Sequence, residues 1–390
     1  VIFHRSVNKF IYFRKFYILK LSRVLFFLFI CVKYKTMIAA AGIKITKVET
    51  SKLQGMALEN LPFGRYFTDH MLEADYENGE WTNVEIKPYQ PLLLDPSTAA
   101  LHYGQAIFEG IKAYAYANGK ASIFRPFDNF SRFNISAERM CMPVVPEEIF
   151  IEGMRTLIEL DKSWIPSLPE HSLYIRPFMF ATDAVIGVKP SAKYKFMILL
   201  SPTGPYYAAP MKIYVEETYT RAAPGGVGFA KNAGNYGGSM LATELAKKQG
   251  YDQVLWTDAF EHKYLQEVGT MNVFFIIGNQ AITPSLEDGT ILAGVTRNSA
   301  IVVLKEMGLD VTERKISIDE LMEAHKSGQL REVFGTGTAA TISMIKELRY
   351  KEDTMYFDTD KFEVAHELKN RLNAIRDGHT ADTHGWMYMI

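Results

Sequence analysis

A single lysine stands in a run that contains five glycines, residues 225–237. Glycine at this density lets the backbone approach a ligand closely. Ala230 and Ala233 flank Lys231. In an apolar setting the lysine amine would have a lowered pKa and act as a nucleophile. The spacing is not the G-x-G-x-x-G of a dinucleotide site. If this run is considered alone, the alternative interpretation is a solvated lysine in a surface loop.

A carboxylate and two glycine turns could complete a site of this kind. Glu267 comes just before an apolar strand expected over 271–277, where a buried carboxylate would need a cationic partner such as a protonated pyridine nitrogen. Taken alone, Glu267 would more often be an exposed residue at a strand end. Residues 294–296 lead into a helix expected to begin near Arg297, and 335–339 read Gly-Thr-Gly-Thr-Ala. Glycine before a helix N-terminus presents free N–H groups to an anion.

Together these segments are far more specific than any one of them. The chain resembles the branched-chain aminotransferase family of fold-type-IV pyridoxal-phosphate enzymes over residues 61–388. The matching runs are 100–104, 108–110, 124–132, 173–177, 231–237, 267–272 and 334–339. The resemblance implies a small N-terminal α/β domain and a larger C-terminal domain, of mixed α/β and α+β character, with the cofactor between them.

The resemblance also implies a role for particular residues. Lys231 would be the catalytic residue and form a Schiff base with C4′ of pyridoxal 5′-phosphate, while Tyr236 contacts the phenolic oxygen and Glu267 the pyridine nitrogen. The phosphate would be bound by Arg132, Val295, Thr296 and Thr338. The substrate would be bound by Tyr103, Phe108, Tyr174, Arg176, Tyr206, Thr270, Thr338 and Ala339. Tyr174 and Arg176 are two residues apart on an expected strand, so both side chains point to one face.

The implied activity is reversible amino transfer between L-leucine, L-isoleucine or L-valine and 2-oxoglutarate. The alternatives are a D-amino-acid aminotransferase or an aminodeoxychorismate-lyase-like enzyme of the same fold, or a non-catalytic binding protein. A binding protein would be expected to lack Lys231 or Glu267. Mammalian relatives carry a Cys-x-x-Cys pair after the Gly-Thr-Ala run, whereas this chain has Ala340 and Ser343, so no thiol switch is expected there.

The elements that must position these residues alternate between strand-like and helix-like periods, which indicates an α/β or α+β enzyme. We expect a leader over 1–36 outside the fold, a small domain over 37–203, a connection over 204–216 and a large domain over 217–390. Asp128 is expected to cap a helix, and another helix is expected from about Ser239 to Gly250. A strand is expected over 253–257, and Ser317 and Glu320 are expected to form a capping box.

Composition limits the function classes. The chain has 390 residues and a net charge of −1, but residues 1–36 hold eight basic and no acidic side chains. The rest is therefore at −9 (35 basic minus 44 acidic), which argues against a nucleic-acid surface.

Cys31 and Cys141 are the only cysteines, so a disulfide framework is not expected and a reducing cytoplasm fits. The apolar run 24–32 is too short to span a membrane. The expected partners are amino acids, 2-oxo acids and a second copy of the chain in a homodimer.

Overall fold

The computed structural model describes residues 42–56, 58, 61–116, 119–207 and 209–390. The chain divides into two units, 1–44 and 45–390, with β1 (Lys44–Ile45) at their junction. The expected leader, 1–36, lies outside the described residues, and the account below concerns 45–390 alone. Among the described residues, no helix is both long and apolar enough to cross a bilayer.

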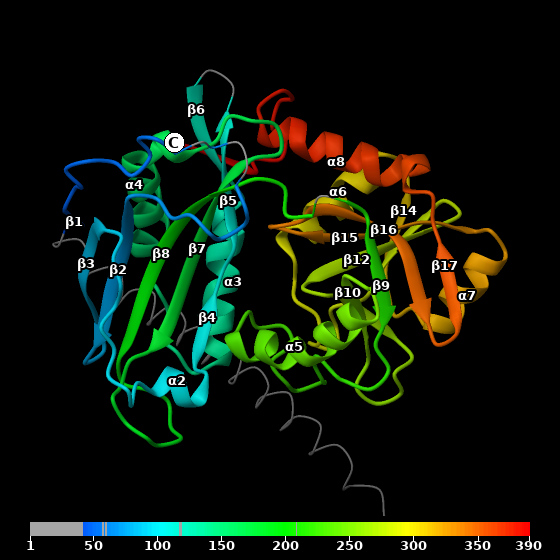
Figure 1. The fold of residues 1–390 in the computed structure, drawn as a ribbon, viewed down its shortest axis with the longest axis horizontal. Helices are drawn as coiled ribbons and strands as arrows, with labels where there is room; N and C mark the ends of the chain where they lie inside the picture. Colours follow the sequence, from blue (N-terminus) through cyan, green and yellow to red (C-terminus); the bar gives the residue numbers. More distant parts are fainter. Residues whose placement is uncertain (1–41, 57, 59–60, 117–118, 208) are drawn as a thin grey trace, which may run out of the picture. The chain divides into compact units, whose positions relative to one another are not determined.

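The first sheet is antiparallel and holds strands in the order β3-β2-β8-β7-β5-β6-β18, with β4 paired to β7 (Figure 1). Its strands are β2 (His70–Glu77), β3 (Glu80–Pro88), β4 (Ala106–Phe108), β5 (Ile111–Tyr116), β6 (Lys120–Phe124), β7 (Ser172–Ala181), β8 (Tyr194–Thr203) and β18 (Met387–Met389). The last strand, β18, is formed by residues near the C-terminus. Residues 387–389 therefore belong to the first sheet, whereas all of 217–390 was expected to form the other domain.

Five helical segments accompany this sheet. They are α2 (Ala99–Tyr103), α3 (Pro126–Arg139), a π-helical turn (Glu148–Glu152) that continues into α4 (Gly153–Leu160), and a 3-10 turn (Lys162–Trp164). Phe133 of α3 and Phe150 of the π-helical turn are fully buried and pack on Phe196 of β8, with ring centroids 5.6 and 5.7 Å away. Contacts of this kind between buried rings add to the free energy of burial. These contacts fix α3, which carries Arg132, against the sheet.

The expected cap of α3 is wrong. The helix begins at Pro126, and its cap position is Arg125 in a left-handed conformation with φ of 49°. Asp128 lies inside the first turn, where its carboxylate accepts two hydrogen bonds from the Arg125 guanidinium, at 3.0 and 2.9 Å. Proline is favoured at the first helical position because its missing N–H would be unpaired there in any case.

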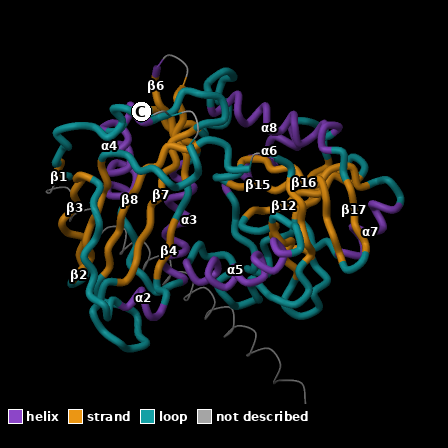
Figure 2. Tube along the Cα trace, viewed as in Figure 1, coloured by secondary structure: helices purple, strands orange, loops and turns teal. Residues whose placement is uncertain are grey.

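The second sheet is mixed, and its strands follow the order β11-β10-β9-β16-β15-β12-β13-β14, with β17 on β16 (Figure 2). Its strands are β9 (Met211–Val215), β10 (Gln253–Thr257), β11 (Leu265–Val268), β12 (Met271–Ile277), β13 (Gln280–Thr283), β14 (Asp310–Glu313), β15 (Leu330–Gly337), β16 (Thr341–Tyr350) and β17 (Asp353–Tyr356). Its helices are α5 (Ala233–Lys248), α6 (Val295–Glu306), α7 (Ile318–Lys326), a 3-10 turn (Thr359–Lys361) and α8 (Glu363–Arg376).

Both faces of the second sheet are covered. Apolar residues of α7 pack with one face, and those of α6 and α8 pack with the other. Strand β12 lies between neighbours and is buried over most of its length, which explains why all its residues except Asn272 are apolar. The strands expected over 253–257 and 271–277 are confirmed as β10 and β12.

Two helix predictions have different outcomes. Helix α7 begins after Ser317, whose side chain accepts the Glu320 N–H at 3.1 Å as expected, but the Glu320 carboxylate pairs with Arg314 instead of closing the capping box. Helix α5 begins at Ala233, well before Ser239, because Asn232 caps it by accepting the Asn235 N–H at 3.2 Å. This earlier start places Lys231 directly before the helix.

The expected connection is shorter than 204–216. Strand β8 ends at Thr203 and β9 begins at Met211, so residues 211–215 of that range form a strand between β10 and β16. The domain boundaries themselves stay a prediction.

Candidate active site

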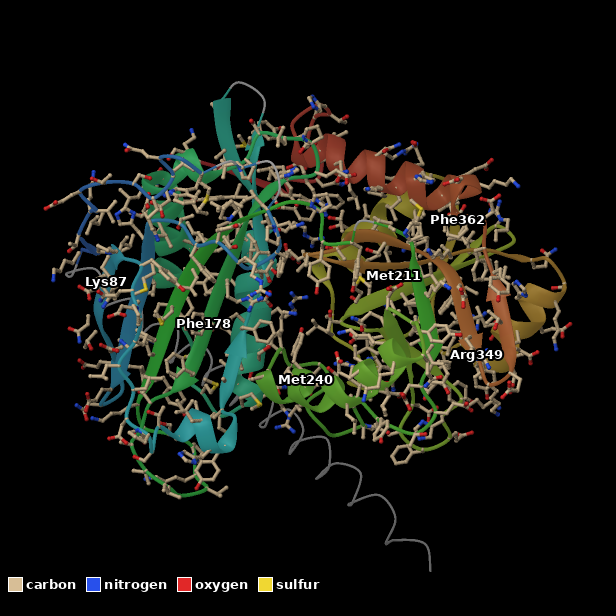
Figure 3. All side chains as sticks on the ribbon, in the orientation of Figure 1. Lys87, Phe178, Met211, Met240, Arg349 and Phe362 are labelled. Carbon is tan, nitrogen blue, oxygen red and sulfur yellow. The ribbon has the colours of Figure 1, made fainter. Side chains whose placement is uncertain are left out.

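A cavity of 510 Å³ lies between the two sheets, and almost every residue expected in the site lines it. This volume is within the range of about 300–1,000 Å³ that small-molecule and cofactor pockets occupy. The expected residues that line it are Phe108, Arg132, Tyr174, Arg176, Tyr206, Lys231, Tyr236, Glu267, Thr270, Val295, Thr296, Thr338 and Ala339. Met240 of α5, labelled in Figure 3, lines the same cavity and was not expected.

The backbone of Lys231 is held by residues of the first sheet and of its helix α3. Its N–H donates to the hydroxyl of Ser136 on α3 at 2.9 Å, and its carbonyl accepts the N–H of Phe108 on β4 at 3.0 Å. The amine Nζ donates to the hydroxyl of Tyr236, on the first turn of α5, at 2.7 Å. The half-buried lysine is therefore aimed at one point of the cavity, and the reading of a solvated loop lysine is wrong.

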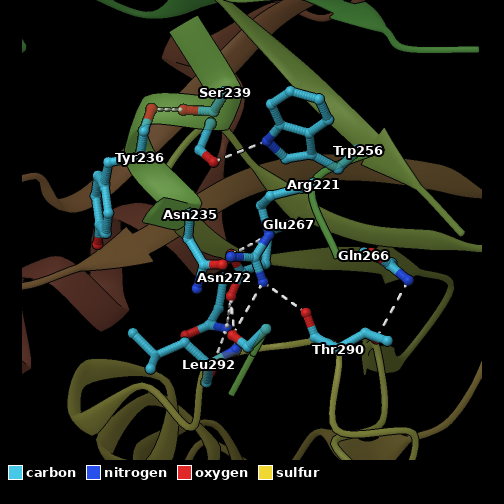
Figure 4. A network of polar contacts seen from close by, with 12 residues as sticks. Arg221, Asn235, Tyr236, Ser239, Trp256, Gln266, Glu267, Asn272, Thr290 and Leu292 are labelled. Carbon is cyan, nitrogen blue, oxygen red and sulfur yellow. Dashed lines mark hydrogen bonds and ion pairs between the residues drawn. The ribbon is translucent and has the colours of Figure 1, made fainter. Parts of the chain in front are cut away.

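Glu267 is buried at the end of β11 and has protein partners on both oxygens (Figure 4). Oε1 accepts the Leu292 N–H at 2.8 Å, and Oε2 lies 3.1 Å from Nε of Arg221 in an ion pair without hydrogen-bond alignment. Burial raises the pKa of Glu267, and the Arg221 guanidinium limits that rise. The alternative expectation, that Glu267 is an exposed residue at a strand end, is thus wrong. Arg221 was not expected from the sequence, although a buried carboxylate requires a cation within the protein.

Arg132 forms a bidentate ion pair with Glu109, a fully buried residue that the sequence analysis did not single out. Nε and Nη2 donate to the two Glu109 oxygens at 2.7 and 2.9 Å, and Nη1 donates to the Ala293 carbonyl at 2.9 Å. A longer contact joins Nη2 to Asn129 at 3.4 Å. Burial alone lowers the pKa of Arg132, but the Glu109 carboxylate raises it overall. One N–H of the five in a guanidinium is left for an anion in the cavity.

The anion end of the cavity is the N-terminus of α6. The helix starts at Val295, two residues before the expected start, and its cap residue Gly294 provides no side chain to pair with the first N–H groups. A Cβ on Gly294 would lie 2.0 Å from the Asn272 side-chain oxygen, so a side chain does not fit there. Unpaired N–H groups and the helix dipole favour an anion at this position.

The other end of the cavity is aromatic and contains one arginine. Nη2 of Arg176 donates to the Tyr174 hydroxyl at 3.0 Å, and its guanidinium carbon lies 4.8 Å from the centre of the Phe108 ring. Among the described residues, no carboxylate forms an ion pair with Arg176, and its Nε is buried without a hydrogen-bond partner. Phe63 completes this wall, with its ring 4.7 Å from Tyr174 and 4.9 Å from Tyr206. No motif or periodicity around Phe63 could have indicated it.

Tyr103 is the expected site residue that does not line the cavity. It is the last residue of α2, which Gly104 ends in a left-handed conformation, and 39% of Tyr103 is exposed. Tyr103 is not among the residues that line the cavity of its own chain, so its expected contact with the substrate stays a prediction.

A lysine paired with a tyrosine, a buried carboxylate and an uncapped helix N-terminus around one cavity define an enzyme of the pyridoxal-phosphate class. Residues 106–348 match the family described as amino-transferase class IV, and the chain belongs to that family. The fold class and the cofactor expected from the sequence are thereby confirmed.

Two relatives and one solved structure illustrate the similarity. The chain is 47% identical over 333 residues to the probable branched-chain-amino-acid aminotransferase of Staphylococcus epidermidis, covering 84% of this chain and 92% of the relative. It is 48% identical over 333 residues to branched-chain-amino-acid transaminase 1 of Bacillus subtilis, covering 84% and 93%. The crystal structure of the Escherichia coli branched-chain amino acid aminotransferase superposes with a TM-score of 0.68 at 27% identity, covering 82% of this chain and 98% of that one.

The donor set fits pyridoxal phosphate. The α6 N-terminus and the spare Arg132 N–H suit a phosphate, the buried Glu267 suits a protonated ring nitrogen, and Lys231 suits an aldehyde carbon. All of them line the same cavity.

Proposed function

We propose that this protein is a branched-chain amino-acid aminotransferase that moves an amino group reversibly between L-leucine, L-isoleucine or L-valine and 2-oxoglutarate. One observation carries the substrate assignment. The compartment beside Lys231 combines an aromatic wall with Arg176, which has no carboxylate partner among the described residues. An apolar side chain would contact the wall, and the distal carboxylate of glutamate would pair with the arginine.

The assignments of individual residues follow from the same geometry. Lys231 would hold the cofactor and, once released from it, take the proton from Cα of the amino acid, because its Nζ is aimed at the cavity by Tyr236. Glu267 would keep the ring nitrogen protonated, and Arg221 would keep Glu267 ionised. When bound, pyridoxal phosphate supplies an electron sink for the pair left at Cα and carries the amino group.

The anion contacts would divide between two ends of the cavity. The N–H groups of Val295 and Thr296 and the spare Arg132 N–H would bind the phosphate. The turn at Thr338 and Ala339, together with Thr270, would receive the α-carboxylate of the substrate. The phosphate and the α-carboxylate would then be bound by separate groups.

We also propose a homodimer in the cytoplasm. Tyr103 does not line the cavity of its own chain, and Leu101 of the same short helix is 64% exposed. The family resemblance implies that pocket residues are shared across a dimer interface, which would give Tyr103 a site in the partner subunit. The exposed free thiol of Cys141 is compatible with a reducing compartment.

The test uses the purified protein loaded with pyridoxal phosphate. L-leucine and 2-oxoglutarate should yield glutamate and 4-methyl-2-oxopentanoate in equal amounts, and leucine alone should shift the visible absorption band. D-leucine should do neither. Turnover of D-leucine in place of L-leucine would assign the D-amino-acid alternative, and release of an aromatic amine from an aminodeoxychorismate would assign the lyase.

A further inference from the structure

A buried lysine of the first sheet reaches across to the substrate end of the cavity. Lys112 lies on β5 opposite Tyr174 of β7, and only 5% of it is exposed. Its Nζ donates to the carbonyl oxygen of Ala339 at 3.0 Å. The two residues are 227 positions apart in the sequence and belong to different sheets. This contact therefore fastens a turn of the second sheet to the first sheet.

The turn that Lys112 holds has free hydrogen-bond donors. Residues 338–340 connect β15 to β16, and Thr341 follows in a left-handed conformation with φ of 59°. Within the described part of the chain, the N–H groups of 338–340 donate to no protein acceptor. Thr338, Ala339 and Ala340 all line the cavity that contains Lys231.

A trans peptide group points its C=O and N–H in opposite directions. Fixing the Ala339 carbonyl toward Lys112 therefore fixes the Ala340 N–H away from it and limits the rotation of the whole turn. Among the described residues, no side chain of the turn bonds the Ala339 carbonyl. The nearby Ser343 hydroxyl donates instead to the carbonyl of Ala340, at 3.2 Å.

The hold does not depend on the charge of the amine. Burial lowers the pKa of Lys112 to about 7, and the nearby Arg376 lowers it while Glu170 raises it. An ammonium and a neutral amine both carry N–H groups, so either form can donate to a carbonyl. Without a donor, the half-buried Ala339 carbonyl would lose its partner, and an acceptor left unpaired away from water costs free energy.

We propose that Lys112 is a positioning residue for the substrate carboxylate. By holding the Ala339 carbonyl, it orients the free N–H groups of the 338–340 turn toward the cavity, so that they receive the α-carboxylate of the amino acid. This inference rests on the proposed function, in which the carboxylate binds at that turn. Lys112 touches neither substrate nor cofactor and acts through the turn alone.

The test compares Lys112→Met, which removes the donor, with Lys112→Arg, which keeps one. The matched control is Lys369→Met. Lys369 lines the same second cavity of 580 Å³ as Lys112 but pairs with Glu170 at 2.5 Å and does not touch the turn. If Lys112→Met does not fold, Lys112→Gln, whose side chain is too short to reach the carbonyl, replaces it with the same expected results.

The first measurement is amide hydrogen exchange in the peptide that covers 337–344, read at the strand amides of 341–344, because the N–H groups of 338–340 are already free. This measurement needs no activity. Exchange should be about tenfold faster in Lys112→Met than in the wild type, the factor that corresponds to one lost hydrogen bond. It should be unchanged in Lys112→Arg and Lys369→Met. Unchanged exchange in Lys112→Met would overturn the hold on the turn.

The second measurement is the single-turnover rate with L-leucine and with 3-methylbutylamine, which is leucine without its carboxylate. For Lys112→Met we expect the apparent dissociation constant of leucine to rise about tenfold, with the limiting rate within about threefold. The slow reaction of the amine should not change. Equal losses with both substrates would overturn the carboxylate role. If the wild-type protein does not react with L-leucine, the proposed function is refuted instead. The hydrogen-exchange result would still decide whether Lys112 holds the turn.

Discussion

The amine of Lys231 donates a 2.7 Å hydrogen bond to the hydroxyl of Tyr236, which lies five residues further along the chain on the first turn of α5. This pair exists because α5 begins at Ala233, so that the lysine precedes the helix and the tyrosine stands on it. The remaining groups of the cavity are arranged around this pair, and their roles can be tested one at a time.

The first prediction is that Lys231 is the only lysine that binds the cofactor. Borohydride reduction of the loaded enzyme, followed by peptide mass mapping, should find the phosphopyridoxyl mass on Lys231 alone. Lys112 is the informative internal control, because burial lowers its pKa to about 7, yet it lines the second cavity. A phosphopyridoxyl group on Lys112 would contradict the mechanism.

The second prediction concerns Arg176→Leu. The distal carboxylate of glutamate would lose a charge-assisted contact, so the half-reaction with glutamate should weaken by about 10- to 150-fold, which corresponds to about 1.5–3 kcal/mol. The half-reaction with leucine should stay within about threefold, because its side chain contacts the aromatic wall. Single-turnover rates for each amino acid separate the two, and equal losses would show that Arg176 supports the fold.

The third prediction concerns the ion pair between Arg132 and Glu109, which is buried on both sides. Glu109→Gln leaves the guanidinium without its counter-ion, which should lower the free energy of unfolding by about 3–5 kcal/mol and weaken retention of the cofactor. Urea unfolding measures the first effect and dialysis the second. Glu367→Gln is the control, since the Glu367 pair with Arg371 is exposed and should change stability by less than about 1 kcal/mol.

The fourth prediction is a pH dependence of stability. Below about pH 7 Lys112 is protonated in the folded and the unfolded chain, so it contributes no slope. Between about pH 7 and the ordinary lysine pKa of 10.5 only the unfolded chain keeps this proton, so the free energy of unfolding rises with pH. The slope for one proton approaches about 1.4 kcal/mol per pH unit.

Urea titrations of the wild type and Lys112→Met at pH 6, 7, 8 and 9 measure this contribution. The free energy of unfolding of the wild type minus that of the variant should be flat between pH 6 and 7 and should rise above pH 7. A difference that stays constant to pH 9 would show that Lys112 titrates near its ordinary value.

The sequence alone predicted much of the local structure. Strands β10 and β12 were predicted because a buried strand is a short, continuous apolar run, and α7 because Ser317 caps it. The start of α5 was missed, because its first turn, Ala233 to Tyr236, contains residues that carry no apolar period and includes a glycine. A helix whose beginning is set by a cap and by packing across the cavity has a weak local signal.

The sequence by itself also determined the family and half of the residues that line the cavity, since residue types such as Lys231 and Glu267 are tied to the chemistry and occur in short, ordered runs. Only the tertiary structure decided how these groups are paired. Glu109 binds Arg132, Arg221 faces Glu267, and Lys112 holds Ala339 across 227 positions. Each pair joins residues far apart in the chain, and the reason for pairing is burial: a charged or polar group removed from water needs a partner, and the fold, not the neighbouring sequence, determines which partner is within reach.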